Sequence, residues 1–413
     1  MPTVNIATLE NDLLLRRVWE GLGTPECHIT GGYVRDRLLG RESVDLDLVL
    51  PGNIEALTGP ARRLAARLDT RAHILGRDTK RVWRIECPEI KIELWPLGNL
   101  SLDDDIRRRD FSFNALFWQL PAGPFDDRVG GQKDLENGVI RALSRQNLED
   151  DPVRLVRAPR FLAQLEGFTL DPHTVGWISS FAPAVANAPR ERIGQELLKL
   201  LAAPGAADGL RSLLELGLFE PAAPAAARCD RDWIERNLLA AERLSGSAPH
   251  PVAASVRESG DSVGLALLVR AWGCPDANAI APFAWLRSDR RHAARAAALL
   301  EHALATAHAP AADRRAFIHN AGTAFPTILA LSAAVEPDRN WPRWWRLWRE
   351  RGQELVWPHP LLTGEEIASI LEIEPGPGLG YAVDALAKAQ VRGRVRSTRS
   401  ATRWLREWSK RNG

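Results

Sequence analysis

The residues that could carry out chemistry begin with two carboxylates near the amino terminus. Asp45 and Asp47 lie two residues apart in residues 44–50, where apolar and polar positions alternate. A strand has this period of two, so both side chains would lie on one face. Adjacent carboxylates repel each other, and a hard divalent cation such as Mg²⁺ removes that cost. The pair predicts a Mg²⁺ site that also takes substrate phosphates, with a solvated strand edge as the plain alternative.

A glycine turn precedes the carboxylates. Gly31 and Gly32 would let backbone amides approach an anion at the start of the next helix, where the helix dipole favours phosphate. Arg35 adds a fork of hydrogen-bond donors, and Asp36 follows it directly. Together with the carboxylates, this stretch predicts a site that binds a nucleoside triphosphate through its metal.

A second polar cluster follows at residues 104–116. Arg108 and Arg109 supply permanent positive charge, Asp110 can orient one of them, and Asn114 offers an amide to a ribose hydroxyl or a backbone group. Consecutive arginines usually form a solvated face. Here the Phe-containing continuation indicates a half-buried element.

A third cluster begins a predicted helix at residues 150–161. Asp151 and Arg154 are three residues apart and share a face, which Arg157 continues. On an exposed helix such a pair contributes little to stability. Pro159 is expected to kink this helix, because it removes a backbone donor.

Taken in order, these clusters resemble the motifs of class II tRNA nucleotidyltransferases and bacterial poly(A) polymerases, which are polymerase-β-like nucleotidyltransferases. Residues 107–116 resemble Arg-Arg-Asp-Phe-Thr-x-Asn-Ala, with Ser112 in the Thr place. Residues 150–154 resemble Glu-Asp-x-x-Arg, with Asp150 in place of the Glu. The resemblance covers residues 27–201 and extends to the tail.

The resemblance implies that a nucleoside monophosphate passes from NTP to an RNA 3′-hydroxyl, releasing pyrophosphate, without a nucleic-acid template. The residues implied as catalytic are Asp45, Asp47 and Glu93, of which Asp45 and Asp47 would hold Mg²⁺; for Glu93 a surface Lys/Glu face is the equal alternative. The residues implied as nucleotide-binding are Gly31, Gly32, Arg35, Asp36, Arg108, Arg109, Asp110, Asn114, Asp151, Arg154 and Arg157. Asp151 and Arg154 would present hydrogen-bonding groups to the base.

The resemblance leaves the added nucleotide open. Relatives that add the final A carry a flexible loop between the first two motifs, and relatives that add only CC have it shortened. Here only residues 95–104 separate the Glu93 strand from the arginine motif. We therefore expect C or CC addition to tRNA from CTP, with complete CCA addition from CTP and ATP still open. A poly(A) polymerase is the alternative within the family, and a non-catalytic RNA-binding relative is a remote one.

The elements needed to position these residues fall into an α+β arrangement. Strands are expected at residues 27–30, 46–50, 72–75, 81–86 and 90–94, and helices at residues 1–25 and 54–68. Strand patterns stop near residue 150. We expect a mixed-sheet catalytic head at 1–145, a helical neck at 146–205, a helical body at 206–345 and a basic helical tail at 346–413. In the neck, Arg192 and Glu196 are expected on a helix that stabilises the pocket from behind.

Composition limits the partners. The formal net charge is only +2, so RNA binding requires local clusters of basic residues. The tail supplies one, with Arg392, Arg394, Arg396 and Arg399 predicted to bind RNA at the tRNA elbow. A tryptophan stripe from Trp341 to Trp348 is interleaved with arginines, which indicates a packing helix more than an RNA-stacking surface. Four scattered cysteines and the absence of a signal-peptide or membrane-span pattern indicate a cytoplasmic protein.

Overall fold

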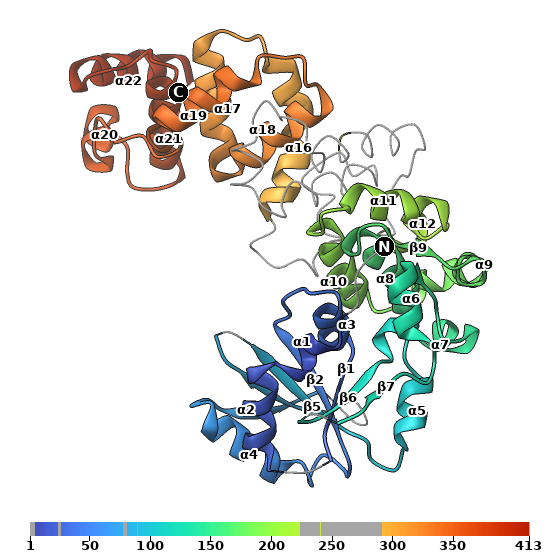
Figure 1. Cartoon of the computed structure of the whole chain (residues 1–413). Helices are drawn as coiled ribbons and strands as arrows, with labels where there is room; N and C mark the ends of the chain where they lie inside the picture. Colours follow the sequence, from blue (N-terminus) through green and yellow to red (C-terminus); the bar gives the residue numbers. More distant parts are fainter. Residues whose placement is uncertain are drawn as a thin grey trace. The chain divides into compact units, whose positions relative to one another are not determined.

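The computed structural model describes residues 5–23, 26–76, 81–88, 90–121, 123–223, 240 and 291–412. These residues form two compact units (Figure 1). The first comprises Met1–Glu196 and Ser212–Ala222, and the second comprises Leu197–Arg211 and Ala223–Gly413. The predicted body spans residues 206–345. Its residues 224–290, apart from residue 240, lie outside the described residues.

A mixed sheet forms the centre of the first unit. Its strand order is β3-β4-β5-β2-β1-β6-β7. Neighbours are antiparallel except β2 and β5, which run parallel. The strands are β1 (His28–Thr30), β2 (Asp45–Leu50), β3 (Ala72–Leu75), β4 (Val82–Glu86), β5 (Lys91–Pro96), β6 (Phe117–Gln119) and β7 (Phe125–Asp126).

Strand register places the polar residues in one row across the sheet. Thr30 lies opposite Asp47, Asp47 opposite Glu93, and Glu93 opposite Arg84. The intervening Leu46, Leu48, Ile92 and Leu94 are fully buried on the other face. The alternation expected for β2 is therefore confirmed, and it separates a polar face from an apolar one.

Short helices surround this sheet and continue into the neck. The side chain of Ser101 caps α5 in a capping box with Asp104, which explains why the chain turns directly from β5 into a helix. The helices of this part are α1 (Ala7–Glu10), α2 (Leu13–Leu22), α3 (Gly32–Leu38), α4 (Thr58–Arg67), α5 (Leu102–Arg107), η2 (Ser112–Asn114), α6 (Gly131–Asn137), α7 (Arg145–Asp150), α8 (Val153–Gln164), α9 (Pro172–Phe181), η3 (Ala182–Asn187), α10 (Arg190–Leu201), α11 (Ala206–Glu215) and α12 (Phe219–Ala222).

Two details of the neck differ from expectation. The helix predicted at residues 150–161 begins only at Val153, so Asp151 precedes it with an extended backbone; the helix then runs through Pro159, and the expected kink stays a prediction. A two-residue strand, β9 (Thr169–Leu170), pairs with β8 (Val139–Ile140) beside α8, because backbone groups there find partners outside a helix. The α+β head with helical parts after it is otherwise confirmed.

The described residues of the second unit form helices and their connections, without a strand. Its helices after residue 290 are α16 (Arg291–Thr306), α17 (Ala311–Ala321), η6 (Gly322–Ala324), α18 (Phe325–Val335), α19 (Trp341–Val356), α20 (Gly364–Leu371), α21 (Pro377–Val391) and α22 (Thr398–Asn412). The stretch Ala311–Val335 is long and apolar enough for a membrane span, but 72% of its most apolar window is buried inside the protein, as in a core helix.

The tryptophan stripe packs inside this unit. Trp341 and Trp344 are 1% and 2% exposed, and Trp344 and Trp348 lie against Phe325. The packing interpretation of this helix is therefore confirmed for these three rings. The tail has its own core, formed by α20, α21 and α22 around Ile367 and Leu405.

Candidate active site

One cavity of about 710 Å³ brings the three sequence clusters together in the first unit. It is reached by residues of the glycine turn, β2, the segment around α5, and the helices α8 and α10. Its lining is Gly31, Gly32, Asp47, Asn53, Ile54, Arg81, Trp95, Pro96, Leu97, Gly98, Leu100, Asp105, Arg108, Arg109, Asp110, Asn114, Asp151, Arg154, Arg157 and Arg192. Six of these side chains are arginines and four are aspartates, so the cavity suits an anion bound through a cation.

Asp47 is the strand carboxylate that faces the cavity. Burial and the nearby charge of Glu93 raise its pKa to about 6, although Arg109 partly opposes the shift. The hydrogen bond that it accepts from Trp95 Nε1 is long, at 3.4 Å. On the neighbouring strand Thr30 Oγ1 is buried without a hydrogen-bond partner. Mg²⁺ prefers hard oxygen ligands, and a cation would also offset the unfavourable burial of the Asp47 charge. The carboxylate and hydroxyl oxygens of Asp47 and Thr30 therefore fit a divalent cation.

The other two predicted carboxylates are held by cations on neighbouring strands. Asp45 is 64% exposed in its side chain and pairs with Lys91 Nζ at 2.9 Å. Glu93 accepts from Arg84 Nε at 3.1 Å and also pairs with the terminal nitrogen of Arg84. Neither Asp45 nor Glu93 lines the cavity. A metal at Asp45 would therefore have to displace Lys91, and Glu93 acts on Asp47 through its charge.

The glycine turn approaches Asp47 closely. Gly31 has a φ of 74° and a ψ of −142°, a region open to glycine. A Cβ built there would lie 3.3 Å from Asp47 Oδ2 and 3.7 Å from the Arg109 guanidinium. Both predicted glycines line the cavity, as the anion-binding interpretation requires.

In the second cluster, one aspartate binds both arginines. Asp105, which the sequence analysis did not single out, accepts from both Arg108 and Arg109, with 2.8 Å to Arg109 NH2. Burial would raise the pKa of Asp105, but the two guanidiniums lower it below its ordinary value. The ring of Phe117 lies 4.8 Å below Arg109. The two arginines are thus fixed at the cavity wall.

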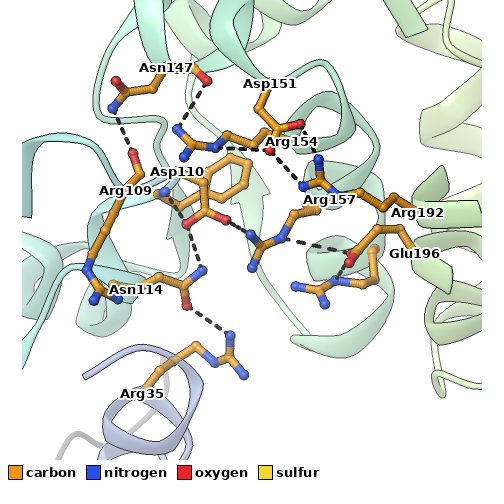
Figure 2. A network of polar contacts seen from close by, with 12 residues as sticks. Arg35, Arg109, Asp110, Asn114, Asn147, Asp151, Arg154, Arg157, Arg192 and Glu196 are labelled. Carbon is orange, nitrogen blue, oxygen red and sulfur yellow. Dashed lines mark hydrogen bonds and ion pairs between the residues drawn. The ribbon is translucent and has the colours of Figure 1, made fainter. Parts of the chain in front are cut away.

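Asp110 and Asn114 organise the centre of the network shown in Figure 2. Asp110 is buried, accepts from Asn114 Nδ2 at 3.1 Å, and pairs with Arg157 NH1 at 2.6 Å. Burial would raise its pKa, but Arg157 and these hydrogen bonds hold it below the usual range. Asn114 Oδ1 in turn accepts from Arg35 NH1 at 3.1 Å.

Arg35 and Asp36 are not among the residues that line the cavity, and their predicted nucleotide-binding role stays a prediction. Arg35 is buried, donates to both carboxylate oxygens of Asp36 at 2.8 Å, and lies outside the cavity lining. The reason is packing: its guanidinium stacks over the ring of Phe161, 5.1 Å from the centroid. In this arrangement Asp36 holds Arg35, and Arg35 donates to Asn114.

The third cluster places a donor and an acceptor together at the cavity wall. Arg192 of α10 donates twice to Asp151, at 3.0 and 2.7 Å, whereas Arg154 Nε lies 4.0 Å from the same carboxylate. Burial would raise the pKa of Asp151, but Arg192 lowers it below its ordinary value. Arg192 thus lines the pocket with Asp151, in contrast to the purely supporting role expected for it.

Behind the wall, α8 and α10 share buried charge. Glu196 lies 3.2 Å from Arg160 Nε and 3.9 Å from Arg157 Nε. Burial lowers the pKa of Arg160 to about 10, which Glu196 opposes. The supporting role predicted for Glu196 agrees with this arrangement.

Asn147 belongs to this network, although the sequence analysis did not single it out. Its side-chain amide donates to the carbonyls of Arg107 and Arg109, both at 2.7 Å, and its own carbonyl accepts from Arg154 at 3.1 Å (Figure 2). It joins the arginine turn to the helix that carries Arg154. No local pattern marks it, because its partners lie about 40 residues away in sequence.

The four tail arginines predicted to bind RNA belong to the second unit. Arg392, Arg394 and Arg396 occupy the turn between α21 and α22, and Arg399 opens α22; all four are exposed. They are accessible to a polyanion.

Comparison with known proteins gives the same picture. Residues 27–141 match the family model described as the poly A polymerase head domain. Residues 167–229 match one described as a probable RNA and SrmB-binding site of polymerase A. The fold is similar to that of the Bacillus stearothermophilus CCA-adding enzyme in complex with CTP, with a TM-score of 0.70 at 23% identity over 96% of this chain and 98% of the other.

Relatives extend along nearly the whole chain. The A-adding tRNA nucleotidyltransferase of Deinococcus radiodurans is 30% identical over 93% of this chain and 96% of its own length. The CC-adding tRNA nucleotidyltransferase of Geobacter sulfurreducens is 32% identical over 91% of this chain and 90% of its own. The chain therefore belongs to the family of tRNA nucleotidyltransferases and bacterial poly(A) polymerases.

Proposed function

We propose that this protein adds C residues to the 3′ end of tRNA from CTP, releasing pyrophosphate. The observation that carries the proposal is the single cavity that Gly31, Asp47, Arg109, Asp151 and Arg154 share. A nucleoside triphosphate has a polyanionic end that suits the glycine turn and the arginines. Its base has hydrogen-bonding groups that suit Asp151 and Arg154.

The Asp151–Arg154 pair supports selection of C or A over U and G. Cytosine and adenine each carry an amino donor next to a ring-nitrogen acceptor, whereas uracil and guanine carry a carbonyl next to a ring N–H. A carboxylate accepts only, and a guanidinium donates only. The pair therefore complements C and A, and it leaves buried groups unpaired against U and G.

Chain length between the first two motifs supports C over A. No connection from β2 to α5 exceeds the seven residues 51–57 between β2 and α4. The connection between β5 and α5 is pinned by a hydrogen bond from Leu97 N to Leu50 O and another from Gly98 N to Gly52 O. The loop that accompanies A addition in the family is therefore short in this chain. Addition of A alone is the second candidate, because the Deinococcus radiodurans relative matches end to end.

Asp45 and Asp47 would hold Mg²⁺ in this proposal. When bound, Mg²⁺ supplies charge that activates the attacking 3′-oxygen and stabilises the leaving pyrophosphate. The chain contributes Arg108 and Arg109 to the phosphates and Asp110 and Asn114 to their alignment. Lys91 would release Asp45 when the cation binds. The tail arginines would bind the tRNA elbow, in a cytoplasmic protein.

The test uses tRNA transcripts that end before the first C, after one C, or after two. Each is incubated with Mg²⁺ and with CTP, ATP, UTP or CTP plus ATP, and products are separated at single-nucleotide resolution. Two additions with CTP and none with ATP would support the proposal. Addition of A only to the transcript ending in CC would establish the second candidate and refute ours.

Other outcomes also decide. A complete CCA end with both nucleotides would refute the argument from the short loop. Long ladders with ATP alone would identify a poly(A) polymerase. Bound tRNA with no addition under any condition would identify a non-catalytic RNA-binding relative.

A further inference from the structure

Behind the cavity wall, three arginines surround one aromatic ring. Phe161 of α8 is fully buried, and the guanidinium carbons of Arg35, Arg157 and Arg160 lie 5.1, 5.6 and 4.0 Å from its ring centroid. An aromatic ring attracts a guanidinium within about 6 Å, and more strongly where water is excluded. Because Arg35 belongs to α3 and the other two to α8, the ring joins the glycine-turn helix to the neck. We propose that Phe161 is a positioning residue that keeps the cavity wall at the spacing a nucleoside triphosphate requires.

The polar network of Figure 2 closes on this ring. Arg157 pairs with Asp110 at 2.6 Å, and Asp110 accepts from Asn114 at 3.1 Å. Asn114 in turn accepts from Arg35 at 3.1 Å. Both ends of this chain of contacts, Arg157 and Arg35, meet at Phe161. Asp110, Asn114 and Arg157 line the cavity and Phe161 does not, so loss of the ring would loosen the wall from outside it.

Two further phenylalanines fix the ring against the second cluster. Phe111 and Phe113 meet Phe161 edge to face, with 5.4 and 5.1 Å between centroids and interplanar angles of 83° and 87°. Aromatic pairs prefer this arrangement because the edge of one ring is positive and the face of the other is negative. Phe111 and Phe113 lie between Asp110 and Asn114 in the sequence. The aromatic cluster therefore ties α8 to the segment that carries these two polar residues.

The three arginines would separate without a shared contact. Burial lowers the pKa of Arg160, Glu196 opposes that shift, and the like charges of Arg157 and Arg35 add to it. The carboxylate partners lie on three different elements, so they hold each arginine separately. The ring of Phe161 is an attraction that all three arginines share. The ion pairs are Arg35–Asp36, Arg157–Asp110 and Arg160–Glu196.

This inference deepens the proposed function and rests on it for the ligand, a nucleoside triphosphate. The proposed base-reading residues, Asp151 and Arg154, lie outside the closed network. Loss of the ring should therefore weaken every nucleotide that the wild type binds by a similar factor. A ring that only fills the core would affect stability alone.

The experiment compares Phe161→Leu with a matched control in the full chain. Leucine is apolar but has no aromatic face. Phe168→Leu is the control, because Phe168 lies 6.5 Å from Phe113 in the same cluster and no guanidinium of the described residues lies over its ring. Calorimetry with CTP, ATP or UTP and Mg²⁺ gives Kd, and steady-state addition gives KM and kcat. Thermal unfolding confirms that each variant is folded at the assay temperature.

We expect Kd and KM to rise about tenfold in Phe161→Leu and kcat to change less, because a desolvated cation–π contact contributes about that factor. The control should match the wild type. Phe161→Met is the second variant, read where the leucine variant does not fold, because methionine fills irregular core space without an aromatic face. It should show the same rise.

Each contrary outcome is distinct. Unchanged Kd and KM in a folded Phe161 variant would overturn the inference, because the ring would then only fill the core. An equal loss in Phe168→Leu would also overturn it, because general loosening of the aromatic cluster would explain the data. Nucleotide binding without any transfer of C to tRNA would refute the proposed function, and the Kd comparison would still test Phe161.

Discussion

Asp47 lies in an environment that is unfavourable for a charged carboxylate. It is a largely buried carboxylate next to Glu93, and its pKa rises to about 6 for that reason. Such a group lowers stability in exchange for a site that a cation can complete. Arg84 holds the neighbouring Glu93 and leaves Asp47 as the carboxylate that faces the cavity.

We predict that Asp47→Asn lowers nucleotide addition at least about 10³-fold, because the amide keeps the shape but cannot hold a cation as a carboxylate does. The same change removes the repulsion by Glu93, so the thermal unfolding midpoint should stay constant or rise. Single-turnover addition and thermal unfolding measure the two effects. An active variant, or an inactive one that has unfolded, would contradict the assignment.

The raised pKa of Asp47 also predicts a pH dependence of stability. The ordinary value is 3.8 and the folded value is about 6, so the metal-free folded state binds more protons than the unfolded state between them. Stability therefore falls as pH rises through about 6. The wild type should lose stability relative to Asp47→Asn between pH 4 and pH 7. Added Mg²⁺ should reverse the loss at pH 7; parallel curves for the two proteins would refute the shift.

Asn147 should set the position of the arginine turn. Asn147→Asp keeps the shape but has no N–H for the carbonyls of Arg107 and Arg109. We predict that KM for CTP rises about 10- to 100-fold, since two hydrogen bonds are lost and a buried charge is added, and that kcat changes less. Gln146→Ala is the control, because Gln146 is exposed on the same helix. Equal effects on kcat and KM would argue against a positioning role.

At the scale of elements, the site depends on how α8 and α10 pack. The helix α8 carries Arg154, Arg157 and Arg160 on one side. From α10, Glu196 pairs with Arg160, and Arg192 pairs with Asp151. Arg157 forms an ion pair with Asp110, which belongs to the second cluster. Helix packing therefore couples the residues that would read the base to those that would align the phosphates.

We predict that Glu196→Gln destabilises the protein by about 3 kcal/mol, because Arg160 would remain buried without its counter-charge. A fall of roughly 5–10 °C in the first thermal transition corresponds to this value. Glu191→Gln, on the exposed face of the same helix, should leave the transition unchanged. A small effect of Glu196→Gln would mean that solvent already compensates Arg160.

At the scale of the whole molecule, charge is divided unevenly. The net charge of the chain is only +2. Nevertheless, the second unit exposes Arg392, Arg394, Arg396 and Arg399 close together in sequence. RNA binding should therefore depend on this local cluster.

If the four tail arginines each neutralise a phosphate, tRNA affinity should fall roughly 50- to 150-fold between 50 and 200 mM salt. Salt titration of tRNA binding tests this, and substituting all four by Gln should flatten the dependence. A flat dependence in the wild type would place tRNA recognition elsewhere.

Much of this protein is determined by local sequence. Alternation in residues 44–50 determines that Asp45 and Asp47 share one face of a strand. The apolar residues that alternate with them are buried on the opposite face. The spacing of Arg154 and Arg157 places them on one side of α8, whereas Asp151 precedes that helix in an extended conformation. The tryptophan spacing determines that Trp341 and Trp344 pack together. These properties follow from backbone period, which each segment carries by itself.

Only the tertiary structure determines which charged residues form ion pairs with each other. Lys91 pairs with Asp45, Arg84 with Glu93 and Arg192 with Asp151, and Arg35 donates a hydrogen bond to Asn114. The strand pairs depend on the register of β2, β4 and β5, and the Arg192–Asp151 pair joins α10 to the segment before α8, 41 residues away in sequence. Ion pairing falls off within a few ångströms, and sequence period contains no information on distances between elements. The chemistry of each residue is thus local, but its partner is set by packing.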